Sequence, residues 1–118
     1  MTEFTHRYFF KKKSRLLKYK NYDYVFNKNN KTDSKEFMIL ARNNNLPYPR
    51  IGLIVSKKNI KKSYLRNRIK RLIRETFRLL QHKLLLMDFV ILAKKDSAVS
   101  NNNKLVSVLK YLWYRYYR

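Results

Sequence analysis

Residues 66–74, RNRIKRLIR, hold five cations in nine positions, and four lysines precede them. Like charges three or four residues apart destabilise a helix by about 0.2–0.5 kcal/mol per pair, and cations near a helix start also oppose its dipole. Guanidinium groups bind phosphates with two hydrogen bonds and stack on bases, and free N–H groups at a helix start bind anions. The cluster therefore predicts phosphate binding. The alternative is an ordinary solvated helix face.

Residues that could catalyse a reaction are few and scattered. The seven acids are Glu3, Asp23, Asp33, Glu36, Glu75, Asp88 and Asp96, without the short recurring spacing of clustered metal-binding carboxylates. His6 and His82 lie far apart, so an acid–base pair would need a long-range contact that nothing in the sequence supports. There is no cysteine and no glycine-rich phosphate loop. We predict no catalytic residue, no metal ligand and no cofactor bound by the protein alone.

The overall charge points to a polyanionic partner. The 118 residues fit one domain, 1–118, and carry 29 Lys and Arg against 7 Asp and Glu, a formal charge of +22. Nucleic acid is the first candidate partner and an anionic membrane the second. The arginine content, without signs of a helix-turn-helix, zinc finger or leucine zipper, favours folded RNA. No apolar run suits a membrane span and no signal peptide is visible, so we expect a soluble, cytoplasmic protein.

A helix over 63–83 must position the basic cluster. Its apolar arc comprises Leu65, Ile69, Leu72, Ile73, Thr76, Leu79 and Leu80, with Phe77 at the edge. The opposite arc comprises Asn67, Lys70, Arg71, Arg74 and Arg78, with Arg66 and Arg68 at its borders. Glu75 is the one acid among them, placed to pair with Arg71 and Arg78.

Three apolar segments predict strands, at 36–42, 51–56 and 88–94. The stretch NNNLPYP between the first two has turn chemistry and predicts an antiparallel hairpin. The basic helix links the last two strands, which permits parallel pairing. Residues 28–34 and 100–103 are polar enough to be loops.

Two further helices flank these strands. Asn21 is the expected cap of a short helix reaching about residue 27, and residues 1–20 form an irregular basic and aromatic arm. A C-terminal helix has Trp113 and Tyr116 among its inner residues, whereas Tyr114 and Tyr117 point elsewhere. The predicted order is α-β-β-α-β-α, a single α+β domain with a small mixed sheet packed by helices.

The block 50–95 resembles the protein subunit of bacterial ribonuclease P. It reads RIGLIVSKKNIKKSYLRNRIKRLIRETFR and then MDFVILAKK, with VSKK, RNR and DFVILA in family order and spacing. RLL at 15–17, NYDYVF at 21–26 and the C-terminal helix match more weakly. The resemblance implies a left-handed crossover between the parallel strands, against the general handedness rule.

This resemblance implies a non-catalytic subunit that binds a catalytic RNA and helps it remove the 5′ leader from precursor tRNA. The RNA would make the cut with magnesium ions at its own active site, and we expect one monomeric protein per RNA. The residues expected to contact that RNA are Lys57, Lys58, Lys61, Lys62, Arg66, Asn67, Arg68, Lys70, Arg71 and Arg74. Two alternatives are a ribosomal or general structured-RNA-binding protein without a role in cleavage, and an independent nuclease.

The resemblance also implies a cleft for the single-stranded leader, between the sheet and the first helix. Tyr22 and Phe26 match the aromatic pair of that helix, Phe37 could join them, and Arg15 lies in the basic arm alongside. Unpaired bases stack on such rings for about 1–3 kcal/mol each. The alternative is that these rings are core. Leu40 stands where some relatives carry a tyrosine, which would weaken one stacking contact.

Overall fold

The computed structural model describes residues 12–118, so most of the predicted arm lies outside the described residues. Its four strands are β1 (Asn30–Asp33), β2 (Phe37–Asn43), β3 (Arg50–Ile54) and β4 (Met87–Ala93). They form one sheet in the order β1-β2-β4-β3, in which β3 and β4 are parallel and the other neighbours antiparallel. The predicted mixed sheet and its parallel pair are confirmed, while the hand of the crossover stays a prediction.

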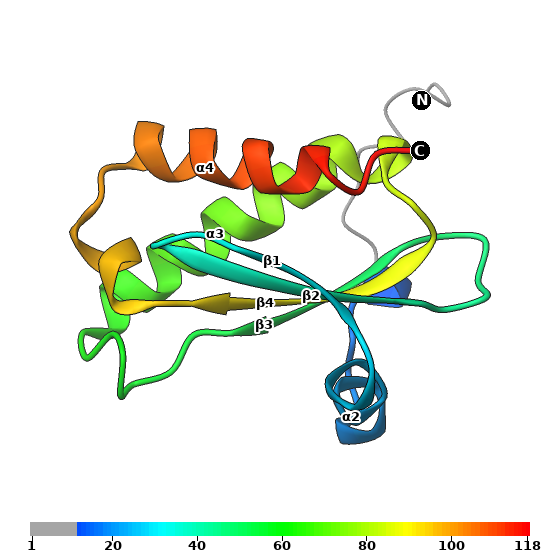
Figure 1. Cartoon of the computed structure of the whole chain (residues 1–118). Helices are drawn as coiled ribbons and strands as arrows, with labels where there is room; N and C mark the ends of the chain where they lie inside the picture. Colours follow the sequence, from blue (N-terminus) through cyan, green and yellow to red (C-terminus); the bar gives the residue numbers. More distant parts are fainter. Residues whose placement is uncertain (1–11) are drawn as a thin grey trace.

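Within residues 12–118, three α-helices cover the two faces of the sheet. They are α2 (Tyr19–Asn27), α3 (Ser63–Leu80) and α4 (Asn102–Tyr114), and the 3₁₀ turns are η1 (Lys12–Ser14), η2 (Gln81–Lys83) and η3 (Lys95–Val99). Figure 1 shows α3 and α4 side by side above the sheet and α2 below it. The predicted α+β class is confirmed. The sheet thus separates two surfaces, one belonging to α3 and α4 and the other to α2.

The expected hairpin between β2 and β3 is wrong, because β4 lies between these two strands. β4 is buried along most of its length. A central position in the sheet covers both faces of this strand with other elements and both of its edges with neighbouring strands. At the end of the sheet, Arg50 donates two hydrogen bonds to the buried carboxylate of Asp88, at 2.8 and 2.7 Å. Asn44 donates a third, at 3.0 Å, which ties the connecting loop to β4.

The edge strand β1 occupies part of the segment that was predicted to be a loop. Its sequence, NKTD, carries no apolar pattern, so periodicity gives no sign of a strand. One side chain accounts for its place: Thr32 is buried, and its hydroxyl shares a 2.7 Å hydrogen bond with the hydroxyl of Tyr116. The remaining polar side chains are exposed, as is common on an edge strand.

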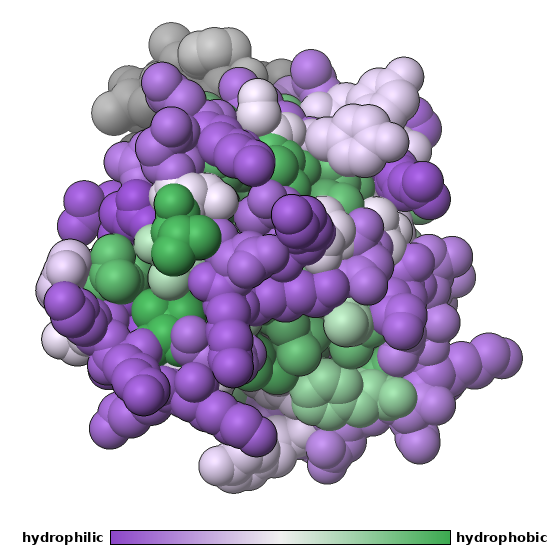
Figure 2. Space-filling model, turned by 60° about the vertical axis from the view of Figure 1, so that its left-hand side comes forward, coloured by the Kyte–Doolittle hydropathy of each residue, from purple (hydrophilic) through white to green (hydrophobic). Residues whose placement is uncertain are grey.

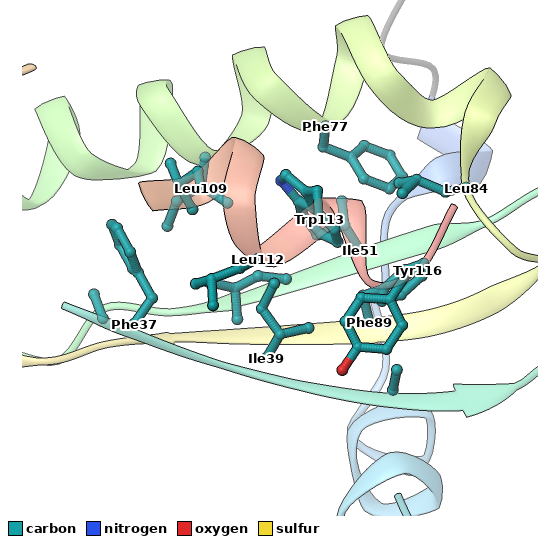
Figure 3. Close-up of a cluster of buried hydrophobic side chains, with 14 of the residues drawn as sticks. Phe37, Ile39, Ile51, Phe77, Leu84, Phe89, Leu109, Leu112, Trp113 and Tyr116 are labelled. Carbon is teal, nitrogen blue, oxygen red and sulfur yellow. The ribbon is translucent and has the colours of Figure 1, made fainter. Parts of the chain in front are cut away.

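The main core lies between the sheet and the helices α3 and α4, as Figure 3 shows. Trp113 is fully buried, packs edge-on against Phe89 with ring centroids 5.2 Å apart, and donates a 3.2 Å hydrogen bond to Thr76. The predicted burial of Trp113 and Tyr116 is confirmed. Leu79, expected in the apolar arc, is 41% exposed, and Phe77, expected at its edge, is fully buried.

A smaller core lies on the opposite face, under α2. Leu16, Val25, Leu40 and Val90 are buried there. The helix begins at Tyr19, so Asn21 is not its cap residue, as had been predicted. Asn21 instead accepts a 3.4 Å hydrogen bond from the backbone N–H of Lys18, the residue that precedes the helix.

Candidate nucleic-acid interface

The basic helix α3 has a buried side and an exposed cationic side. Ile69, Ile73, Thr76 and Phe77 are buried, whereas Asn67, Arg71 and Arg74 are exposed and Lys70 is half-buried. The first turn carries neither an acid nor a side-chain cap. The N–H groups at that end therefore add to the positive potential of the lysines before them. This arrangement suits the phosphates of a polyanion.

The loop before α3 presents four exposed lysines on a fixed turn. They are Lys57, Lys58, Lys61 and Lys62. Ile60 in their midst is 1% exposed, and its N–H donates a 3.0 Å hydrogen bond to the carbonyl of Ser56. This side of the molecule comes forward in Figure 2, where hydrophilic side chains cover most of the surface. The buried isoleucine anchors the turn, so the lysines project from a defined backbone.

Arg66 and Arg68 lie at the borders of the cationic face and have partners within the protein. Arg66 donates hydrogen bonds of 2.9 and 2.7 Å to the carbonyls of Ile60 and Lys61, which holds the lysine loop against the helix. Arg68 donates to the side chain of Asn102 at 3.0 Å and to the carbonyl of Ser100 at 3.2 Å. Sequence reasoning missed these bonds, because it cannot see which carbonyls the fold brings near a guanidinium. Their contact with RNA stays a prediction.

Glu75 pairs with Arg78, one of the two arginines that the helical spacing offers as partners. Its carboxylate lies 2.5 Å from the guanidinium of Arg78 and raises the pKa of that group. Glu75 lies one turn beyond Arg71 and directly follows Arg74, and Arg78 lies one turn beyond Arg74. The acid is thus matched within the helix at the end away from the lysine loop, and the first half of α3 keeps its positive charge.

Tyr22 and Phe26 lie together at the surface, on the other side of the sheet. Their ring centroids are 6.5 Å apart, and Phe26 is 45% exposed. They line a groove of about 300 Å³, whose other lining residues are Leu17, Lys18, Tyr19, Asp23 and Ile54. Tyr22 is half-buried, and an open groove with an exposed phenylalanine ring beside it can accept a stacked base. The structure brings together the aromatic pair that the resemblance assigns to the leader.

The Tyr22 ring packs closely against Gly52 in β3, the one glycine of the sequence. A Cβ built on it would lie 2.7 Å from three atoms of the Tyr22 ring. Sequence reasoning did not single out Gly52. The available clue was a glycine inside an apolar strand, which often marks the close approach of another group.

Phe37 does not belong to this groove, so its prediction as a leader contact is wrong. It is fully buried in the main core, and Figure 3 shows it on the side of the sheet that Trp113 and Leu109 cover. Successive residues of a strand point to opposite faces. Leu40 and Met38 are therefore the residues of β2 that pack in the cluster under α2.

Arg15 lies at a basic hollow beside the groove. Arg15 is exposed, and its backbone forms an isolated β-bridge with Ile51. The hollow has a volume of about 650 Å³ and shares Leu17 and Lys18 with the groove. The other lining residues are Lys13, Lys20, Asn21, Tyr48 and Arg50. Sequence reasoning named only Arg15 here, because the lysines lie in a segment without regular periodicity. The hollow continues the aromatic groove with cationic side chains, which suit phosphate groups.

Residues 12–118 contain neither a cluster of metal-binding side chains nor a membrane-spanning helix. No group of three or more His, Cys, Asp or Glu side chains in this part of the chain could hold a metal ion. No helix among the same residues is long and apolar enough to cross a membrane.

Known proteins resemble this chain over nearly all its length. The family model for Ribonuclease P matches residues 10–117. A ribonuclease P protein component of Buchnera aphidicola subsp. Schizaphis graminum is 56% identical over 111 residues, which cover 94% of this chain and 97% of that protein. The one from Proteus mirabilis is 49% identical over 109 residues, 92% of each chain.

Solved structures agree with these sequence matches. The RNase P protein of Staphylococcus aureus superposes with a TM-score of 0.79 at 26% identity, covering 84% of this chain and 91% of that one. The RNase P protein of Thermotoga maritima gives a TM-score of 0.76 at 25% identity, covering 86% and 96%. The chain therefore belongs to the family of ribonuclease P protein components, the protein part of a ribonucleoprotein endoribonuclease.

Proposed function

We propose that the chain binds the catalytic RNA through α3 and the lysine loop, and the 5′ leader of precursor tRNA through the groove beside α2. The observation that carries this proposal is the pair of unlike surfaces on opposite faces of one sheet, cationic on α3 and aromatic at α2. We expect one protein per RNA, working in the cytoplasm.

The α3 surface suits a large folded RNA. Its exposed arginines and the four loop lysines would contact phosphates, and such contacts give affinity that falls steeply with salt. Arg66 and Arg68 would act partly by holding the loop and α4 in place, through the hydrogen bonds that they donate to them. The protein contribution is then a rigid, preorganised cationic surface.

The α2 groove suits a single strand without a fixed sequence. Stacking on Tyr22 and Phe26 depends on the flat face that every base has, and the basic hollow beside them would hold the backbone phosphates. A leader that enters this groove is tied to the same protein that grips the catalytic RNA. The substrate would gain affinity that a mature tRNA, lacking the leader, would not.

The cleavage itself is proposed to belong to the RNA. Magnesium ions would act at the active site of the RNA, where they would activate the attacking water and stabilise the leaving oxygen. The chain would contribute to the reaction by binding and orienting the precursor there, so the ions are not assigned to any side chain of the protein.

Reconstitution at low magnesium concentration tests the proposal. Precursor tRNA is incubated with the purified protein, with the catalytic RNA, or with both, and release of the leader is followed. We expect cleavage to be much faster with both than with the RNA alone, and absent with the protein alone. Binding without stimulation would favour the general RNA-binding alternative, and cleavage by the protein alone would favour an independent nuclease. The mass of the complex, by light scattering, checks the expected 1:1 ratio.

A further inference from the structure

The outward side of α4 carries two exposed tyrosines that no surface described above includes. Tyr111 is 69% exposed and Tyr114 is 70% exposed. They lie three residues apart on a helix and are therefore neighbours on its surface. We call these two residues the tyrosine face. Packing does not explain them, because α4 contributes Leu105, Leu109, Leu112 and Trp113 to the core.

The tyrosine face is partly preorganised. The half-buried Tyr117 packs edge-on against Tyr114, with ring centroids 5.1 Å apart. The ammonium group of Lys83 lies 5.9 Å from the centroid of the Tyr117 ring. A ring already held by its neighbours loses less conformational freedom when a ligand stacks on it.

The segment that carries the tyrosine face is positively charged, although one of its lysines, Lys104, lies 3.7 Å from the carboxylate of Glu36. Residues 97–118 contain no aspartate or glutamate and carry four cations, Lys104, Lys110, Arg115 and Arg118. Lys110 and Arg115 are exposed and adjoin Tyr111 and Tyr114 in the sequence. Exposed aromatic rings among cations are typical of surfaces that bind unpaired nucleic acid.

We propose that the tyrosine face stacks on unpaired or helix-terminal bases of the catalytic RNA, an inference that rests on the proposed function. α4 packs beside α3 on one face of the sheet (Figure 1), and Trp113 of α4 donates a hydrogen bond to Thr76 of α3, so the tyrosine face lies at the level of the second half of α3. An RNA that runs along α3 from the lysine loop would reach the tyrosine face there. The leader is excluded as the occupant because its groove lies under α2, on the opposite face.

A second copy of the chain is a poorer fit for the tyrosine face. Each copy carries a formal charge of +22, and the segment around the face contributes only cations. Two such faces would repel each other, whereas RNA offers phosphates to the cations and bases to the rings.

The test compares two double variants of the full-length protein. In one, Tyr111→Leu and Tyr114→Leu remove the aromatic faces but keep apolar side chains of similar size; in the other, both tyrosines become Phe. The equilibrium Kd for the catalytic RNA is measured over a range of salt concentrations. We expect the Leu pair to bind about tenfold or more weakly, and the Phe pair within about twofold of wild type. The salt slope should stay unchanged in both variants, because no phosphate contact is removed.

Three results would overturn this inference: a Leu pair that binds like wild type, a Phe pair as weak as the Leu pair, or a free-protein dimer that the Leu pair dissociates. Thermal unfolding of both variants checks that they fold alike. The failure of the proposed function looks different, since wild-type protein would then neither bind nor stimulate the catalytic RNA. If wild type binds and the Leu pair matches it, only the inference about the tyrosine face fails.

Discussion

Gly52 and Tyr22 are so close that no side chain fits between them: a Cβ at position 52 would lie 2.7 Å from three atoms of the tyrosine ring. Real Cβ contacts are almost never shorter than 3.0 Å, so any substitution at Gly52 must shift either the ring or the strand, and the ring is the more easily moved. The glycine therefore sets the orientation of Tyr22 in the leader groove, although it cannot itself contact a base through a side chain.

Gly52→Ala is expected to weaken binding of leader-bearing precursor tRNA by about fivefold or more, the lower end of one stacked base. Affinity for the catalytic RNA should not change, because α3 lies on the other face of the sheet. Filter binding with both RNAs measures the two constants. In a Tyr22→Ala background the same substitution should add nothing, since the ring it displaces is absent. A full additional loss there would show that Gly52 acts through the strand and not through the ring.

Replacing Tyr22 and Phe26 with Ala is expected to weaken the precursor complex more than the complex with mature tRNA. Each lost stacking contact costs about 1–3 kcal/mol of binding free energy. Mature tRNA has no leader, so it makes no such contact that the substitution could remove. The measurement is the ratio of the two Kd values for the reconstituted holoenzyme, with Tyr24→Ala as the control on a ring of the same helix outside the groove. Equal losses for precursor and mature tRNA would mean that the two rings serve the packing of α2 alone.

Elements with a clear apolar period were predictable from the sequence. The arc of α3 and the apolar strand β4 were found because burial on a helix leaves a 3.6-residue period and burial on both faces leaves a continuous run. β1 was missed because only Thr32 of its four residues is buried. The strand order was also not predicted correctly, since nothing in the sequence of β2 or β3 alone shows that β4 lies between them.

The candidate site was predictable in composition but not in detail. Both faces of β2 are apolar, so alternation could not tell that Phe37 points to the main core and Leu40 toward α2. The cations of α3 were visible as a group. The sequence did not show which of these cations form hydrogen bonds within the protein. The tertiary fold brings carbonyls of the lysine loop to Arg66 and the side chain of Asn102 to Arg68.

Arg71 and Arg68 are expected to behave differently when each is replaced with Ala. Arg71 is exposed, so its loss should lower the log–log salt slope for binding the catalytic RNA by about 0.7–0.9 and leave the melting temperature unchanged. Arg68 donates to Asn102 and to the carbonyl of Ser100, so its loss should reduce the free energy of unfolding by about 1–3 kcal/mol. Salt titrations and urea unfolding measure the two effects. An unchanged slope for Arg71→Ala would contradict its assignment to the phosphate-binding face.

The last prediction concerns the alkaline stability of the fold. Burial raises the pKa of the Tyr116 phenol above its usual range, and the hydrogen bond with Thr32 opposes that rise in part. The folded protein therefore favours the neutral phenol more than the unfolded chain does, where the pKa is about 10. The resulting stability is fully present below pH 10 and is lost as pH rises toward the folded-state pKa.

Tyr116→Phe should thus lower the free energy of unfolding by about 1 kcal/mol at pH 8, because it removes the bond to Thr32. Between pH 8 and pH 10.5 the variant should then lose less stability than wild type, since it no longer has a buried phenol to ionise. Urea unfolding at the two pH values measures both effects. Tyr114→Phe is the matched control, because Tyr114 is 70% exposed and its replacement should leave the pH dependence as it is in wild type. A Tyr116→Phe protein with the same alkaline loss as wild type would show that other groups, and not this phenol, govern the decline.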